Sequence, residues 1–154
     1  MTPGVLALER AGIAHEIRTY ELDPSADNYG PAAAAALGLD PAVVFKTLIV
    51  NVDGKPVVAV VPVTHQCGLK AVASAVGGKR AEMSDPHVAE RLTGYVVGGI
   101  SPVGQKKRLS TVIDISAEGL ERMWVSAGKR GVQIGVAPSD LARITAARFA
   151  AITA

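Results

Sequence analysis

The sequence lacks several features that would each point to a particular class of protein. It has one cysteine, Cys67, in 154 residues, so an internal disulfide is excluded and a reducing compartment is expected. No apolar run approaches the ~18 residues that a membrane span needs. The first residues form neither a signal peptide nor a transit peptide. We therefore expect a soluble, cytoplasmic protein that does not associate with membranes.

Aromatic residues are also scarce, at 4%, although hydrophobic residues together make up 49% of the chain. The core must therefore be built largely from small and β-branched side chains. At ~100 to 200 residues per domain, this length predicts one domain over residues 1–154 with a core of its own.

The net charge of +2 is unevenly distributed along the chain. Residues 1–45 hold six acidic and two basic side chains, whereas residues 46–154 hold eight acidic and fourteen basic ones. A weakly basic surface suits contact with a few phosphates rather than with a long duplex. Ordinary solvated lysines would explain the same balance equally well.

Local sequence signals predict helices and strands that follow one another along the whole chain. The expected helices are 2–12, 31–38, 68–76, one opened by Ser84-Asp85-Pro86 and one capped at Pro138-Ser139-Asp140. The expected strands are 15–20, 45–52, 56–63, the start of 95–104, 111–115, 123–126, 132–136 and a short one near Phe149. Residues 23–30 are rich in turn formers, and Asp53-Gly54 marks the clearest hairpin. This order favours an α+β fold with a mixed, largely antiparallel sheet and helices outside it.

The histidines and the cysteine form no known catalytic or metal-binding pattern. His15, His65 and His87 belong to no HExxH motif and no Ser/His/Asp or Cys/His arrangement, which disfavours a hydrolase with an activated protein nucleophile or zinc-bound water. No metal or other cofactor is expected. Cys67 could be reactive if His65 or Lys70 lowered its pKa, but a lone cysteine at a helix start is more often incidental.

A glycine-rich segment, Gly98-Gly99-Ile100-Ser101, matches neither the GxxxxGK[ST] nor the GxGxxG phosphate motif. It can instead present backbone N–H groups without obstructing side chains, as an oxyanion or carbonyl-binding site requires. A tight turn between packed elements is an equally good interpretation of the segment alone. Five cations lie close by in the sequence, either directly after the segment or in a second Gly-flanked turn: Lys106, Lys107, Arg108, Lys129 and Arg130. Together these features suit a ligand with a carbonyl end and a phosphate-bearing end.

Lys46 interrupts the apolar β-run Val43–Val50. Strand alternation could direct its ammonium group toward a cavity. A lysine of this kind more commonly extends to solvent.

Three segments carry a resemblance to a known family: Phe45-Lys46-Thr47-Leu48, residues 95–108 (YVVGGISPVGQKKR) and residues 125–131 (VSAGKRG). The chain resembles the YbaK/EbsC family of aminoacyl-tRNA editing proteins, which is related to the editing domain of prolyl-tRNA synthetase. It looks closest to the branch that deacylates Cys-tRNA(Pro). Thr19-Tyr20-Glu21, Asp85-Pro86 and residues 138–141 extend the resemblance over nearly the whole chain.

The resemblance implies a barrel-like sheet and a hydrolase that cleaves the ester between a mischarged amino acid, cysteine, and tRNA(Pro). Such a second hydrolytic site is needed because a synthetase pocket rejects an amino acid of similar size only weakly. It implies catalytic roles for Lys46, Gly99, Ile100 and Ser101. It implies substrate contacts from Tyr20, Tyr29, Thr47, Gly98, Ser126 and Asp140. The five cations named above would contact tRNA phosphates, and the partners would be the tRNA(Pro) acceptor end and prolyl-tRNA synthetase.

The family mechanism implies that the substrate's own thiol attacks its ester carbonyl and releases a cyclic thiolactone. This agrees with a chain that shows no activated nucleophile, because positioning and backbone N–H groups suffice to cleave an activated ester. Two departures from the family pattern are Leu22, where a histidine is expected, and the turn Thr64–Gly68. An Ala-tRNA(Pro) deacylase and a non-catalytic module for tRNA 3′ ends or a synthetase remain alternatives, and the sequence does not determine the oligomeric state.

Overall fold

The computed structural model describes residues 1–21 and 29–154, and it contains helices and strands in the mixture that the sequence predicts. The helices are α1 (Pro3–Arg10), α2 (Tyr29–Leu37), α3 (Leu69–Ala75), α4 (Pro86–Thr93) and α5 (Pro138–Thr145), with short 3₁₀ helices η1 (Pro41–Val43) and η2 (Ile115–Ala117). The strands are β1 (His15–Thr19), β2 (Phe45–Val52), β3 (Lys55–Pro62), β4 (Ala81–Met83), β5 (Ser110–Asp114), β6 (Met123–Ser126), β7 (Val132–Val136) and β8 (Arg148–Ala150).

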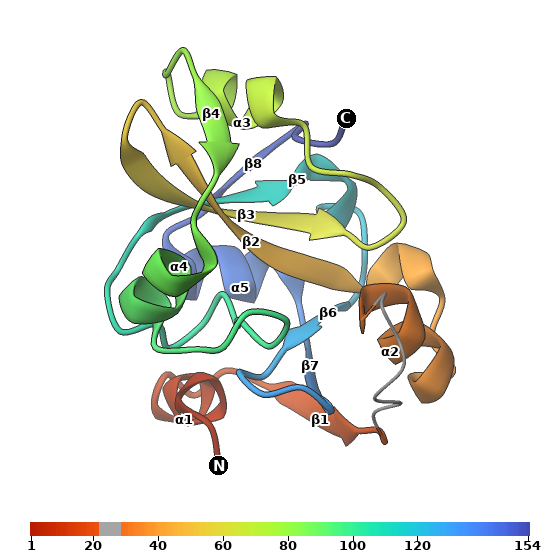
Figure 1. Cartoon of the computed structure of the whole chain (residues 1–154). Helices are drawn as coiled ribbons and strands as arrows, with labels where there is room; N and C mark the ends of the chain where they lie inside the picture. The colour runs from red at the N-terminus through yellow and green to blue at the C-terminus, as the bar shows by residue number, and fades with distance from the viewer. Residues whose placement is uncertain (22–28) are drawn as a thin grey trace.

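The strands form two sheets. One sheet has the order β4-β2-β3-β5-β8, and the smaller one has the order β1-β7-β6. Strands β3, β5 and β8 pair in parallel, and the remaining pairs are antiparallel. The predicted α+β class and mixed, mostly antiparallel sheet are therefore confirmed, but the sheets do not close into a barrel. They meet at a single parallel bridge between Val44 and Trp124 and diverge from it (Figure 1).

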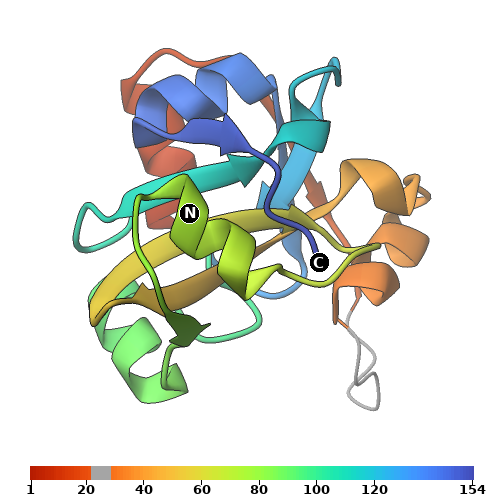
Figure 2. The ribbon, with the colours of Figure 1, turned by 90° about the horizontal axis from the view of Figure 1, so that it is seen from above.

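The five-stranded sheet carries a hydrophobic layer on each face, because side chains alternate along its strands. On one face, Val50, Val52 and Ala59 pack with Val72 and Ala73 of α3. On the other face, Phe45, Ile49 and Val60 join a larger core. This second core also receives side chains from α1, α4, α5 and the three-stranded sheet: Val5, Leu8, Ala89, Leu141, Met123, Val125 and Ile134. Figure 2 shows α3 on the face of the sheet opposite α4.

Side-chain hydrogen bonds cap the predicted starts of α1 and α4. The Thr2 hydroxyl accepts from the Val5 N–H at 3.2 Å at the start of α1, and the Asp85 carboxylate accepts from the His87 N–H at 2.9 Å at the start of α4. The expected side-chain cap of α5 is wrong, since Ala137 occupies the N-cap position without a side-chain hydrogen bond. Asp140 lies in the first turn of the helix instead, where its charge favours the helix N-terminus.

The predicted strand at the start of residues 95–104 is wrong. Its β-branched residues Val96 and Val97 lie in an exposed turn, with 68% and 39% of their surface accessible. The Val97 N–H donates to the Glu90 carboxylate at 2.8 Å, and the Gly99 N–H donates to the Val96 carbonyl at 2.9 Å. These bonds fold the backbone back on itself instead of leaving it extended. The sequence also failed to predict β4.

The predicted turn at residues 23–30 and the departure at Leu22 fall mostly on residues 22–28, outside the described residues. Of the helices in the described ranges, none is long and apolar enough to cross a membrane.

Candidate functional site

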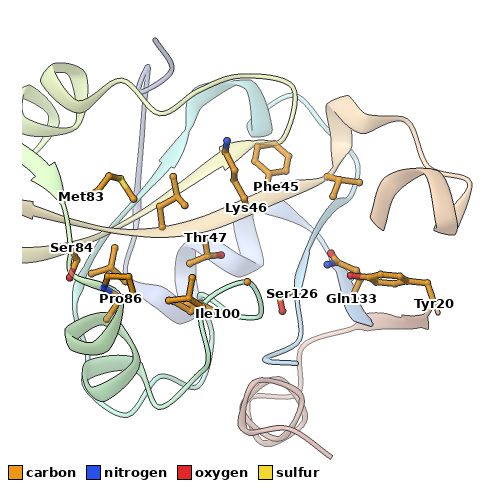
Figure 3. Close-up of a pocket in the computed structure, with 16 residues that line it drawn as sticks. Tyr20, Phe45, Lys46, Thr47, Met83, Ser84, Pro86, Ile100, Ser126 and Gln133 are labelled. Atoms are coloured by element: carbon orange, nitrogen blue, oxygen red, sulfur yellow. The ribbon is translucent and has the colours of Figure 1, made fainter. Parts of the chain in front are cut away.

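The main cavity of the described structure opens where the two sheets diverge, and it has a volume of about 600 Å³. Ligand sites commonly occupy 300 to 1,000 Å³. The lining comes from the start of β2, the segment that leads into α4, the glycine-rich loop, and the ends of β1, β6 and β7 (Figure 3). The lining residues are Tyr20, Val44–Ile49, Met83, Ser84, Pro86, Ala89, Val97, Gly98, Ile100, Ser126 and Gln133.

One wall of the cavity is the open edge of β2. On this side, β2 pairs with β4 only over Val50–Val52, and the bridge to Trp124 lies at Val44, so the residues around Thr47 have no strand partner there among the described residues. The Val63 N–H donates to the Val44 carbonyl, and the Ile49 carbonyl on the opposite edge accepts from Ser84. In an antiparallel strand, the N–H and C=O groups of successive residues point alternately to the two edges. The backbone groups of Thr47 therefore point to the same edge as those of Ile49, which is the open edge. The Thr47 hydroxyl oxygen is also buried without a hydrogen-bond partner in the described structure.

The opposite wall includes the loop at residues 95–105, which several hydrogen bonds hold in place. The buried Tyr95 hydroxyl donates to the Val103 carbonyl at 2.7 Å, and the Gln105 amide donates to the Ser101 carbonyl at 3.0 Å. Burial raises the pKa of Tyr95 to about 12, so this donor stays protonated at neutral pH. The Ser126 hydroxyl donates to the Gly99 carbonyl at 3.0 Å. The loop is therefore fixed before any ligand arrives, as electrostatic stabilisation of a transition state requires.

Gly98 and Gly99 allow the turn at Lys129-Arg130 to approach this loop closely. Gly98 has φ +93°, a conformation that side-chain-bearing residues rarely adopt. A Cβ at Gly99 would stand 3.0 Å from the Arg130 backbone nitrogen. The Arg130 guanidinium donates to the Val97 carbonyl at 3.1 Å. Since the Gly99 N–H is used within the loop, the N–H groups of Gly98 and Ile100 are the candidates for binding a carbonyl oxygen.

Lys46 and Thr47 both line the cavity, but their side chains leave opposite faces of β2. Figure 3 shows the Lys46 ammonium directed away from Thr47 and Ile100. It shares its face of the sheet with Leu48 and lies close enough to Cys67 for its charge to oppose the rise that burial causes in the pKa of that thiol. The structure therefore does not bring the ammonium to the glycine-rich loop. It places the charge on the other side of the open edge.

The other predicted site residues fall into two groups. Tyr20, Gly98, Ile100 and Ser126 line the cavity, whereas Gly99 is outside the lining and its carbonyl accepts a hydrogen bond from Ser126. Ser101 is fully buried behind the loop, where its hydroxyl accepts from the Val103 N–H. Asp140 lies outside the lining and pairs with Arg143 at 3.1 Å. Tyr29 begins α2, and its side chain is outside the described part of the chain.

The predicted phosphate-binding cations do not form one cluster. Lys129 and Arg130 flank Gly98 and Gly99 beside the main cavity. Lys107 and Arg108 line a different cavity of about 220 Å³, together with Ala7 and Ile144. The backbone of Lys106 is tied to the end of α4 by a 2.9 Å bond to the Thr93 carbonyl.

Sequence reasoning missed Gln133 on β7. This side chain is 8% exposed, and its Oε1 atom has no hydrogen-bond partner among the described residues. Leaving a buried polar atom unpaired costs about 1 to 3 kcal/mol, so such an atom in a cavity wall indicates a place for a ligand donor. A single glutamine in a strand carries no sequence motif, and only its alternation with buried neighbours hinted at a position facing a cavity.

Cys67 is half-buried and does not line the main cavity. Burial raises the pKa of its thiol, while the charge of Lys46 acts in the opposite direction and Asp114 adds to the rise. In the described ranges, no group of three His, Cys, Asp or Glu side chains is placed to hold a metal ion.

A fixed loop with backbone N–H donors beside an apolar cavity can bind an acyl carbonyl and stabilise the oxyanion that forms when the carbonyl is attacked. The model for the aminoacyl-tRNA editing domain matches residues 23–144, and the chain belongs to this family. It is 40% identical over 139 residues to the "Putative Cys-tRNA(Pro)/Cys-tRNA(Cys) deacylase EbsC" of Enterococcus faecalis, and the match covers 88% of this chain and 84% of that protein. The predicted family and the predicted enzyme class, a hydrolase of aminoacyl esters, are confirmed.

Two further relatives extend the comparison. The multifunctional Ser/Thr-tRNA deacylase ProXp-y of Escherichia coli K12 is 26% identical over 91% of this chain and 84% of its own length. The proline–tRNA ligase of Geobacter sp. strain M21 is 32% identical over 61% of this chain, which corresponds to only 16% of the ligase.

A crystal structure described as "a putative trans-editing enzyme for prolyl tRNA synthetase" has the same fold. The TM-score is 0.86 with 23% identity, covering 99% of this chain and 95% of that one.

Proposed function

We propose that this protein is a trans-acting editing enzyme that hydrolyses mischarged Cys-tRNA(Pro), and that residues 1–154 act as one catalytic domain. The observation that carries the proposal is the cavity between the open edge of β2 and the glycine-rich loop. All three segments that carry the family resemblance, residues 45–48, 95–108 and 125–131, contribute to this single site. The name of the Enterococcus relative, which describes a deacylase of Cys-tRNA(Pro) and Cys-tRNA(Cys), supports the choice of cysteine.

The cavity divides into an apolar part and a polar part. Pro86 and Ile100 lie at the end near Thr47, where a small amino-acid side chain would be enclosed. Ser126, Gln133 and Tyr20 lie at the other end. The ester carbonyl would lie between the two ends, against the N–H groups of Gly98 and Ile100. The Lys46 ammonium, which lies on the outer side of the β2 edge, would attract the anionic phosphate backbone of the tRNA.

The attacking atom in this proposal is the sulfur of the substrate. The Ser126 hydroxyl is occupied by the Gly99 carbonyl and the Gly128 N–H, and the Ser84 hydroxyl donates to the Asp85 carbonyl. Neither described serine therefore has a base to activate it. The thiol sulfur forms a bond to the ester carbonyl carbon, the ester C–O bond breaks, and the tRNA hydroxyl takes the proton. Water then opens the released thiolactone to cysteine.

We propose that specificity for tRNA(Pro) comes partly from prolyl-tRNA synthetase as a partner. The described cations beside the cavity, Lys129 and Arg130, can contact only a few phosphates, and each neutralised phosphate needs its own cation. The substrate of such a partnership is made in the cytoplasm, where we expect the protein to act.

The experiment that tests the function is deacylation of Cys-, Ala- and Pro-tRNA(Pro), with and without prolyl-tRNA synthetase. We expect multiple turnovers on Cys-tRNA(Pro), little activity on Pro-tRNA(Pro), and a gain when the synthetase is present. Faster turnover of Ala-tRNA(Pro) would instead identify an alanine-specific enzyme that uses water. Protection of charged tRNA at a one-to-one ratio, without turnover, would identify a binding module.

A further inference from the structure

Gln133 and Tyr20 form a recognition element at the polar end of the cavity. Gln133 presents a buried Oε1 atom that has no partner in the described structure. Tyr20 directly follows β1, and its backbone N–H donates to the Gly131 carbonyl at 2.9 Å, which ties it to the start of β7. Figure 3 shows the Tyr20 ring and the Gln133 amide next to each other on the cavity wall.

A flat ring beside a side-chain amide suits a purine base. Aromatic side chains stack on base faces, and a glutamine amide pairs with adenine by accepting from the N6 amine while donating to N7. The orphan Oε1 atom of Gln133 is an acceptor, so it requires a ligand that donates a proton at this point. Adenine offers such a donor on its edge, in the N6 amine.

The spacing along the cavity agrees with this assignment. Ser126 and Gln133 are cross-strand partners, so they stand about 5 Å apart. The Ser126 hydroxyl lies 3.0 Å from the Gly99 carbonyl of the loop. Ile100, Ser126 and Gln133 follow one another across the cavity (Figure 3). In an aminoacyl nucleoside, one ribose separates the base from the ester carbonyl. In the cavity, Ser126 likewise lies between the loop, which would bind the carbonyl, and Gln133, which would bind the base.

We propose that Gln133 and Tyr20 bind the adenine of the tRNA 3′-terminal adenosine, with Gln133 Oε1 accepting from the adenine N6 amine and Tyr20 stacking on the ring. This inference rests on the proposed function and assigns the polar end of its site. It makes Gln133 a positioning residue, because it fixes the base and thereby places the ester carbonyl at the loop.

The test compares two short tRNA(Pro) acceptor helices charged with cysteine, one ending in adenosine and one ending in purine riboside, which lacks the N6 amine. We expect wild-type kcat/KM to fall about tenfold or more on the purine substrate. Gln133→Leu should show the same loss on the adenosine substrate and no further loss on the purine substrate. Gln66→Leu, at an exposed position outside the cavity, serves as the control and should behave as the wild type does.

Binding of the corresponding hydrolysis-resistant amides, measured by titration calorimetry, separates this proposal from the function itself. Equal wild-type affinity for the adenosine and purine amides would overturn the adenine assignment, as would a Gln133→Leu variant that still prefers adenosine. A wild-type preference for the adenosine amide, lost in Gln133→Leu, would support the assignment even if neither ester were hydrolysed. That last result would overturn only the proposed function.

Discussion

The Ser126 hydroxyl donates to the Gly99 carbonyl at 3.0 Å and joins β6 to a loop 27 residues earlier in the chain. The same oxygen accepts from the Gly128 N–H at 3.1 Å. One side chain thus fixes both the glycine-rich loop and the turn that carries Lys129 and Arg130. The geometry of the carbonyl-binding wall depends on contacts between distant parts of the chain.

Gly99→Val should lower turnover by at least about 100-fold, the usual cost of losing one oxyanion donor. A Cβ at this position would meet the Arg130 backbone nitrogen at 3.0 Å, so the loop and its N–H groups must shift. Single-turnover deacylation rates measure the effect, and thermal unfolding reports any general damage. Gly119→Val is the control, since a Cβ there meets nothing within 4 Å. Unchanged kinetics in Gly99→Val would mean that the loop is only a structural turn.

Lys46→Ala should nearly abolish deacylation while the protein stays folded. The side chain is partly exposed, so its loss leaves no large cavity in the core. Lys46→Arg should also be poor, because a planar guanidinium is larger and directs its donors differently. Circular dichroism and deacylation assays on both variants, with exposed Lys70→Ala as the control, test this expectation. Near wild-type turnover in Lys46→Ala would remove the ammonium from the mechanism.

Cys67→Ser should retain most activity, and a metal chelator should have no effect. Burial raises the pKa of the Cys67 thiol, so little reactive thiolate exists at neutral pH. The residue also lies outside the cavity lining. Deacylation rates of wild type, of Cys67→Ser, and of wild type with a chelator test both expectations. A large loss from the serine variant would revive a thiol mechanism, and a large loss from the chelator would reveal a metal.

Ionisation of Tyr95 should lower the free energy of unfolding at alkaline pH. Its pKa is about 12 in the folded protein against 10.0 for a free side chain. The unfolded chain therefore loses this proton first, and the contribution, fully present below pH 10, is lost as pH rises through 12. The loss is at most about 3 kcal/mol, since one pKa unit corresponds to about 1.4 kcal/mol. Urea unfolding of wild type and Tyr95→Phe between pH 9 and 12 should show a shallower decline in the variant.

Local signals predicted the elements whose geometry is set by neighbouring residues. Asp53 and Gly54 adopt positive φ angles of 49° and 82°, as a tight hairpin turn requires. The strands β2 and β3 on either side of this turn could therefore be predicted from the sequence. Val96 and Val97 carry the same β-branched signal as a strand. A contact with Glu90 and two glycines bend them into a turn, and no local pattern records that contact.

The candidate site was predictable only where a motif exists. The glycine-rich segment and Lys46 stand out from their surroundings, whereas Gln133 acquires its role from the cavity that the diverging sheets create. Alternation along β2 places Lys46 and Thr47 on opposite faces, but how much of the edge of β2 away from β3 stays open depends on how short β4 is. The pairing of distant strands determines this property of the site.

We expect the attacking nucleophile to be the sulfur of the substrate. Cysteine's thiol has an ordinary pKa of about 8.5, so part of it is thiolate near neutral pH and a strong nucleophile, unlike a serine hydroxyl. Ser-tRNA(Pro) has nearly the same shape and should bind in the same cavity but be hydrolysed far more slowly than Cys-tRNA(Pro). S-methylated Cys-tRNA(Pro) should be equally resistant.

Product analysis provides the direct measurement. Quenched reactions on Cys-tRNA(Pro), followed by mass spectrometry, should reveal a cyclic thiolactone before free cysteine accumulates. Rapid hydrolysis of the serine or methylated substrate would show that a positioned water attacks the carbonyl. The glycine-rich loop would keep its role in that case, because a carbonyl attacked by water develops the same oxyanion as one attacked by sulfur.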